Sequence, residues 1–370
     1  MAGLSGNRAL AGLAAILGLI GIYLLVQAGP VDRLNVAEVF LNGLLTGIMY
    51  SLVALGFVLI FKSSGIFNYA QGVMALFAAM TLAGIQSGQV PFAHLINAIF
   101  GTSIHHFGWQ VPAVLAIIFT ILVMIGLAWA VERFVLKHLV NQEPIILFMA
   151  TIGLAFFLEG IGDLMWTAEL KYLYLGLPEG GSFWWEDVTR EWAPEDARYF
   201  GMYVDRLDVV AAIVAVVLVV SLTLFSQFTR PGRALRAVAD DHQAALSVGI
   251  SLRTIWVMVW GIAGFIALVA GMMWGAKSGV QFQLSLIALK ALPVLILGGF
   301  TSIPGAIIGG LIIGAGEKFF EYAASSTETF AAIFGSNTSA TENWFAYVLA
   351  LVVLVFRPQG LFGEKIIERV

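Results

Sequence analysis

Long apolar runs of about 20 residues alternate with short polar connections along most of the chain. A helix needs roughly 20 apolar residues to cross the hydrocarbon core of a bilayer, because each residue adds about 1.5 Å of length. Backbone groups in lipid must bond one another, so each run is expected to be a helix. The pattern therefore predicts an all-α, polytopic membrane bundle with about ten spans. They are expected at residues 9–28, 37–61, 66–86, 111–135, 144–166, 207–228, 253–275, 284–300, 305–321 and 343–357.

Three connections between these spans are long. Residues 167–206 form an acidic insertion that holds eight acidic residues against four basic ones. Residues 229–252 combine charged and apolar residues, and residues 322–342 form a connection of mainly small residues. We expect all of them to belong to a single transmembrane domain over residues 1–370.

Arginine and lysine residues collect on one side of the membrane when ten spans are threaded. The opposite connections, residues 29–36 and 87–110, hold only Arg33 between them. Basic residues are enriched in cytoplasmic connections, so both termini and residues 229–252 are expected in the cytoplasm. The acidic insertion and the small-residue connection are then expected on the outer side.

The connection at residues 230–250 reads RPGRALRAVADDHQAALSVGI and has the pattern of a surface helix. Arginines recur at every third position, while apolar side chains gather on another face. Pro231 suits the start of this helix and Gly249 suits its end. A helix of this kind between two membrane spans is one that another protein can grip. The pattern rests on Arg230, Arg233, Arg236, Ala234, Leu235 and Val238.

Ionisable side chains within the spans need an explanation, because charge is costly in lipid. Glu159 and Asp163 lie four residues apart, on one face of the fifth predicted span. They form either a proton relay or cation site, or a pair that reaches outward into the acidic insertion. Lys290 lies in the eighth span, and it is expected either beside a route across the membrane or at the outer boundary.

Residues 62–72 (KSSGIFNYAQG) interrupt two apolar runs. Asn68 and Gln71 need hydrogen-bond partners from the chain or from a ligand, because lipid offers none. A tight hairpin turn in the cytoplasmic headgroup zone is the simpler interpretation of this segment. A second interruption, near residues 290–310, predicts broken half-helices, which membranes tolerate where the backbone is packed in protein or lines a cavity. The candidate pathway residues are Asn68, Tyr69, Gln71, Lys290, Pro293, Gly298 and Gly299.

Glycines after the second interruption are spaced for helix packing. Gly305, Gly309 and Gly314, with Gly310, give the small-xxx-small spacing that lets two membrane helices approach closely. This spacing predicts a helix contact first and a functional role second.

Composition excludes several classes of protein. Hydrophobic residues make up 60% of the chain and charged residues 11%, which rules out an ordinary soluble domain. The net charge of −4 comes without a basic block, so we expect no nucleic-acid partner. The chain has no cysteine, no HExxH, no GxSxG and no phosphate-binding GxxxxGK[ST] sequence, and His105-His106 lacks a third ligand at metal spacing. We expect no catalytic site, no metal site, no bound cofactor and no nucleotide site of its own.

Four ordered motifs resemble the permeases of branched-chain amino acid ABC transporters. They are residues 42–79 (NGLLTGIMYSLVALGFVLIFKSSGIFNYAQGVMALFAA), 230–250, 290–317 (KALPVLILGGFTSIPGAIIGGLIIGAGE) and 356–363 (FRPQGLFG). The chain looks closest to the first of the two permease subunits in such systems, the H-type. The resemblance covers roughly residues 37–370, so residues 9–28 look like an extra N-terminal span.

This resemblance implies a bacterial inner-membrane importer that works by alternating access. Its expected partners are a second permease subunit, two cytoplasmic ABC ATPases that bind ATP and Mg²⁺, a periplasmic substrate-binding protein and membrane lipid. Residues 230–250 would be the coupling helix that sits on an ATPase. The residues that match the family pattern there are Arg230, Gly232, Arg233, Arg236, Ala237, Asp240 and Gly249.

The chain departs from the family pattern at two positions, and the resemblance leaves its substrate open. Tyr69 and Gln71 stand where the family usually has phenylalanine and histidine. Branched-chain amino acids are the expected substrate, with urea, short amides or aromatic acids as alternatives in the same class. An ion-coupled secondary transporter, based on Glu159, Asp163 and Lys290, is the alternative from another class.

Overall fold

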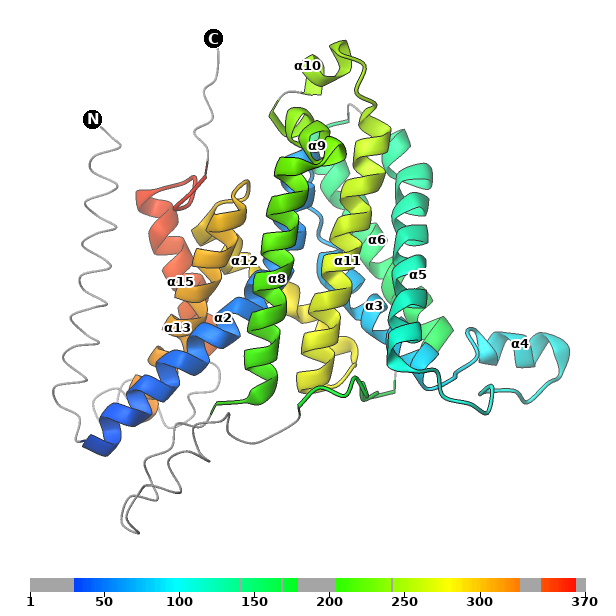
Figure 1. The fold of residues 1–370 in the computed structure, drawn as a ribbon, viewed down its shortest axis with the longest axis horizontal. Helices are drawn as coiled ribbons and strands as arrows, with labels where there is room; N and C mark the ends of the chain where they lie inside the picture. The colour runs from blue at the N-terminus through cyan, green and yellow to red at the C-terminus, as the bar shows by residue number, and fades with distance from the viewer. Residues whose placement is uncertain are drawn as a thin grey trace. The chain divides into compact units, whose positions relative to one another are not determined.

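The computed structural model describes residues 30–139, 142–167, 169–178, 204–240, 242–326 and 341–363. These residues are largely helical, and no β-strand is found among them (Figure 1). The α-helices are α2 (Pro30–Ser64), α3 (Gln71–Gln86), α4 (Ala93–Phe100), α5 (Ala113–Phe134), α6 (Pro144–Trp166), α8 (Arg206–Phe228), α9 (Arg230–Asp240), α10 (His242–Ser247), α11 (Leu252–Ser278), α12 (Ile287–Gly298), α13 (Ile303–Ser326) and α15 (Thr341–Phe356). Two 3₁₀-helices are η1 (Leu136–His138) and η3 (Phe282–Leu286).

The prediction of an all-α membrane bundle is confirmed. Six described helices are long and apolar enough to cross a membrane, namely α2, α5, α6, α8, α11 and α13. Three shorter apolar segments, α3, η3 with α12, and α15, match three further predicted spans. The predicted span at residues 9–28 lies outside the described residues.

Some predicted boundaries differ from the structure. The third span begins as a helix at Gln71 rather than at residue 66, because residues 65–70 are not helical. Helix α13 continues to Ser326, so the first residues of the predicted connection 322–342 are helical. Most of the acidic insertion lies outside the described residues, apart from the segments that join α6 and α8.

The chain gathers into two compact units. Unit 1 contains residues 1–51, 178–213 and 292–370, and unit 2 contains residues 52–177 and 214–291. Helices α2, α8 and α12 each contribute residues to both units. The expectation of a single domain over the whole chain stays a prediction.

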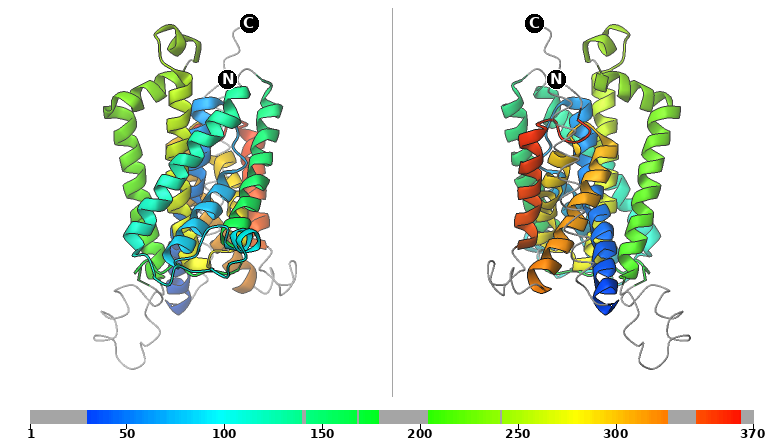
Figure 2. Two further views of the ribbon diagram at one scale, coloured as in Figure 1. Left: turned by 90° about the vertical axis from the view of Figure 1, so that its right-hand side faces the viewer. Right: turned by 90° about the vertical axis from the view of Figure 1, so that its left-hand side faces the viewer.

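Unit 1 is packed through glycines, as their spacing predicted. A Cβ atom at Gly310 would lie 2.5 Å from the carbonyl oxygen of Gly47, and one at Gly43 would lie 2.7 Å from the Cα of Ala315. These contacts bring α2 and α13 into backbone contact, which only small residues allow. Helices α13 and α15 lie side by side, with the ring centroids of Phe320 and Phe345 4.8 Å apart (Figure 2).

Unit 2 is built around α3. Every residue of α3 except Ile85 is buried, and the helix packs against α5, α6 and α11 (Figure 1). A Cβ at Gly84 would overlap the indole ring of Trp166, so α6 can approach α3 only over a glycine. The surrounding helices α5 and α6 are mostly exposed on their other sides. Apolar exposed faces on membrane helices are the faces that lipid covers.

Candidate functional site

Helix α9 starts with a sharp turn after α8. The Thr229 hydroxyl accepts a hydrogen bond from the Gly232 N–H at 3.0 Å, which caps the first turn of α9. A Cβ at Gly232 would overlap the Phe225 carbonyl and lie 2.7 Å from the Cα of Ser226. Only glycine therefore lets α9 fold back so tightly against the end of α8.

Helix α9 has a buried apolar face and an exposed face that carries arginines, as the sequence predicted. Leu235 and Val238 are buried, and α9 packs against α10 and α11. Arg236 donates a hydrogen bond to the Ser226 carbonyl at 2.6 Å, at the carboxyl end of α8 where a cation is favourable. Arg230 and Arg233 are exposed and have no partner among the described residues.

The end of this segment also follows the sequence pattern. Gly249 adopts a φ of 82°, and its N–H bonds the Leu246 carbonyl at 3.0 Å. The Ile250 N–H bonds the Ala245 carbonyl at 3.0 Å, which completes a glycine-terminated helix end. The structure has two helices, α9 and α10, where the sequence predicted one. Val248 is 76% exposed beside this turn, so the exposed surface of the α9–α10 segment offers an apolar group as well as arginines.

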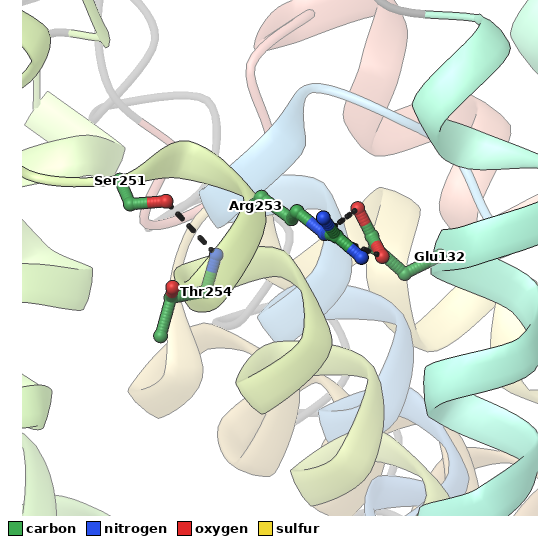
Figure 3. A network of polar contacts seen from close by, with 4 residues as sticks. All are labelled: Glu132, Ser251, Arg253 and Thr254. Atoms are coloured by element: carbon green, nitrogen blue, oxygen red, sulfur yellow. Dashed lines mark hydrogen bonds and ion pairs between the residues drawn. The ribbon is translucent and has the colours of Figure 1, made fainter.

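An ion pair that the sequence analysis missed joins the start of α11 to α5 (Figure 3). The Arg253 Nε lies 3.2 Å from each carboxylate oxygen of Glu132. Glu132 is buried, while half of the Arg253 side chain is exposed. Ser251 caps α11 by accepting a hydrogen bond from the Thr254 N–H at 3.5 Å. The sequence signal was a carboxylate at the end of an apolar run, which calls for a cationic partner.

The break between α2 and α3 is supported by one threonine. Gly65 ends α2 with a φ of 67°. The Thr151 hydroxyl on α6 accepts from the Tyr69 N–H at 3.1 Å. Its own proton can go to the Phe148 carbonyl of α6 at 2.8 Å or to the Phe67 carbonyl at 3.2 Å. These contacts satisfy backbone groups that no helix pairs in residues 65–70.

Asn68 and Gln71 are both completely buried within unit 2. The side-chain oxygen Oδ1 of Asn68 accepts a hydrogen bond from the Ala70 N–H at 3.2 Å, and the side-chain amide nitrogen of Asn68 donates to Gln71 Oε1 at 3.3 Å. The Gln71 amide then donates to the Ala263 carbonyl on α11 at 3.3 Å. The partners that these amides require come from the chain itself. Tyr69 is 37% exposed beside them.

The second interruption lies at residues 299–302, between α12 and α13. Pro293 stays inside α12, so the helix continues past the proline and ends at Gly298. Gly299 has a φ of 101°, and the Leu361 N–H bonds the Leu297 carbonyl at 2.7 Å. The C-terminal FRPQGLFG motif therefore supplies donors to the open carbonyls at the end of α12.

The structure places the other candidates as follows. Asn68, Tyr69 and Gln71 lie together in unit 2, whereas Pro293, Gly298 and Gly299 belong to unit 1. Lys290 is partly buried on α12. On α6, Glu159 is partly buried and Asp163 is exposed. No group of three metal-ligating side chains is found in the described ranges, which include His105 and His106.

Comparison with known proteins identifies relatives over most of the chain. Residues 39–357 match the model of a family described as "Branched-chain amino acid transport system / permease component". The high-affinity branched-chain amino acid permease protein LivH of Escherichia coli K12 is 26% identical, over 89% of this chain and 96% of its own. BraD of Pseudomonas aeruginosa is 28% identical with the same coverage. The fructose import permease FruG of Bifidobacterium longum is 23% identical, over 82% of both chains.

Proposed function

The chain belongs to the family of permease components of branched-chain amino acid transport systems, and we propose that it is a membrane subunit of an ATP-driven bacterial importer for hydrophobic amino acids. The observation that carries this proposal is the α9–α10 segment, in which α9 packs against α11 and exposes two arginines that have no side-chain partner among the described residues. The names of the curated relatives LivH and BraD support a branched-chain amino acid as the substrate.

Helices α9 and α10 form the surface on which an ATPase subunit docks. Arg230 and Arg233 offer charges to the partner, and Val248 offers an apolar contact. Arg236 has a different task, because it holds α9 to the end of α8. Gly232 allows that contact, so two of the family-pattern residues position the helix while two others face the ATPase.

Movement of α9 reaches the membrane through α11. The ion pair of Arg253 with Glu132 ties the first turn of α11 to α5. Further along α11, the Ala263 carbonyl holds Gln71 at the break between α2 and α3. Between these points, Trp256 and Trp260 have buried indole N–H groups without an acceptor in the described part of the chain. Buried donors without partners are costly, so a state that supplies acceptors is favoured, which suits a helix that changes neighbours during transport.

The nucleotide chemistry belongs to other subunits. ATP and Mg²⁺ bind to two cytoplasmic ATPases, and this chain contributes no nucleotide site. A second permease subunit completes the passage, and a periplasmic binding protein delivers the substrate. The arginine-bearing end of unit 2 and both termini then face the cytoplasm, in agreement with the positive-inside rule.

Each interruption contributes candidate residues for the passage of a hydrophobic amino acid. In unit 2 we assign it Asn68, Tyr69, Gln71 and Lys290, and in unit 1 Pro293, Gly298 and Gly299. Irregular backbone in a membrane is tolerated where protein packs it or where it lines a cavity. An aliphatic substrate needs few polar contacts, which fits amides that already have partners.

The test is ATP-driven leucine uptake by the purified complex in proteoliposomes. Arg233→Glu reverses a free charge on α9, so uptake is expected to fall at least tenfold while ATP hydrolysis continues. Lys137→Glu, the same charge reversal outside α9, is the matched control and is expected to keep most uptake. Unchanged uptake in Arg233→Glu would refute the coupling assignment. Uptake of leucine that survives without ATP would refute the importer itself.

A further inference from the structure

A small lobe at residues 89–110 projects from unit 2 between α3 and α5. Not one Asp, Glu, Lys or Arg occurs from residue 63 to residue 131, so the lobe carries no formal charge apart from its histidines. Helix α4 lies within it and buries none of its eight residues. The exposed apolar side chains of the lobe are Leu95, Ile99, Phe100, Ile104, Phe107 and Trp109.

The lobe is held in shape by its own contacts. The Asn97 side chain accepts from the Thr102 hydroxyl at 2.7 Å and from the Ile104 N–H at 3.0 Å, and it donates to the Ile104 carbonyl at 3.1 Å. At the base, the Val90 N–H bonds the His105 carbonyl at 3.0 Å. At the tip, the polar groups around Asn97 thus bond one another, while the base is held to α6 by the Phe92 N–H, which bonds the Met165 carbonyl at 3.1 Å. The large apolar side chains remain on the outside of the lobe.

The position of the lobe shows what surrounds it. Figures 1 and 2 place α4 at the end of unit 2 opposite α9 and α10, where it packs against the end of α6. Helix α6 is long and apolar enough to span the membrane, and it exposes Phe156, Phe157 and Leu164. The apolar surface of the lobe therefore continues from a surface that already faces lipid.

We propose that the lobe lies in the headgroup layer of the outer leaflet, with the apolar face of α4 directed toward the acyl chains. Aromatic side chains such as Phe107 and Trp109 are favourable at that depth, and short amphipathic helices bind bilayers by burying their apolar face there. A soluble partner that docks and leaves would need charges or hydrogen-bonding groups for steering and specificity, and the lobe offers few. The choice of leaflet rests on the proposed function, whereas contact with lipid does not.

The experiment uses the absence of cysteine from this chain, which makes each introduced thiol unique within it, and it uses partner subunits prepared without cysteine. Ile99→Cys and Phe100→Cys carry a spin label in the complete transporter, in nanodiscs of phosphatidylethanolamine and phosphatidylglycerol. Collisions of the label with oxygen and with a water-soluble nickel chelate are measured. Ile118→Cys on α5 is the lipid reference, and Glu169→Cys, an exposed residue after α6, is the water reference. All four sites are exposed, so the labels disturb no core.

The labels at Ile99 and Phe100 are expected to favour oxygen over nickel several-fold more than the label at Glu169, close to the value at Ile118. Nickel access equal to that at Glu169 would overturn the proposal, because the lobe would then stand in water. Low access of both reagents would overturn it too, since a protein would cover the lobe. Leucine uptake by the same labelled complexes reports separately on the proposed function.

Discussion

The two ends of unit 2 both carry short helices outside the spans, yet their chemistry is opposite. At one end, α9 is fixed to α8 by Arg236, and α11 beside it is held by the Arg253–Glu132 pair. Two further arginines, Arg230 and Arg233, are exposed there. At the other end, the 89–110 lobe has no formal charge outside its histidines, and Asn97 ties it to itself.

The difference fits the two proposed roles, coupling to an ATPase at α9 and contact with lipid at the lobe. A helix that is pulled needs rigid links into the bundle, and charged side chains give it an oriented partner. An anchor needs only apolar area and satisfied backbone, because lipid has no fixed shape to match. The predictions below remove these links one at a time.

The largest effect is expected from Gly232→Val, which attacks the turn between α8 and α9. Its Cβ would overlap the Phe225 carbonyl, and backbone atoms cannot move aside as a side chain can. Helix α9 must then leave its position, so ATPase binding and leucine uptake should fall more than about tenfold, the equivalent of roughly 1.4 kcal/mol. Gly261→Val, where a Cβ meets nothing within 4 Å, is the control. Normal co-purification of the ATPase with Gly232→Val would contradict the account.

The second prediction concerns the Glu132–Arg253 pair. Glu132→Gln removes a buried charge and leaves half-exposed Arg253 without its partner, which should cost about 1–3 kcal/mol once solvent screening is considered. Thermal unfolding and the ratio of uptake to ATP hydrolysis should both decrease. A double-mutant cycle with Arg253→Gln separates the pair from its parts. Glu321→Gln, in the more exposed Lys318–Glu321 pair, should cost less than about 0.5 kcal/mol. Equal losses in both pairs would refute a special role for Glu132.

Several helices could be predicted from the sequence because local signals define them. The predicted span at residues 144–166 coincides with α6, because Glu143-Pro144 and Thr167 mark both ends of an apolar run. The two faces of α9 were predictable because they follow a local period, although the sequence predicted one helix over residues 230–250 and the structure has α9 and α10 there. Local signals of this kind account for nine of the ten spans.

Features that depend on distant residues were not predictable in this way. Ile66 and Phe67 continue an apolar run, yet they are not helical, because Thr151 of another helix supports the open backbone. Glu132 and Arg253 are 121 positions apart, so no local pattern relates them. The need for glycine at position 232 was visible as a motif, but its cause is the close approach of α8.

The third prediction tests the support of the break. Thr151→Val keeps the shape of the side chain and removes the hydroxyl that pairs with Tyr69 and Phe67. Because these backbone groups are partly buried, leaving them without the hydroxyl should cost about 1 kcal/mol of stability. Thr120→Val is the matched control, since the buried Thr120 hydroxyl bonds only the Ala116 carbonyl of its own helix. If both variants lower the unfolding midpoint equally, Thr151 has no special role at the break.

The smallest effect is expected at the base of the 89–110 lobe. Here Lys171 donates hydrogen bonds to the Gln89 side chain at 2.8 Å and to the Trp166 carbonyl. Burial lowers the pKa of Lys171 from 10.5 to about 8, against the opposing attraction of Glu169 and Asp163. Between about pH 8 and 10.5 the unfolded chain therefore binds a proton that the folded chain has released. Stability from this group accordingly rises with pH across that window and is constant below it.

Lys171→Met removes this titration. The difference in unfolding midpoint between the wild-type protein and Lys171→Met should shift in favour of the wild type as pH increases from 8 to 10.5. Because the side chain is partly exposed, the shift should stay below about 1 kcal/mol. Lys277→Met, which removes an exposed lysine at the end of α11, controls for the loss of one charge. A difference that does not change with pH, or that changes in the opposite direction, would show that Lys171 is not desolvated at the base of the lobe.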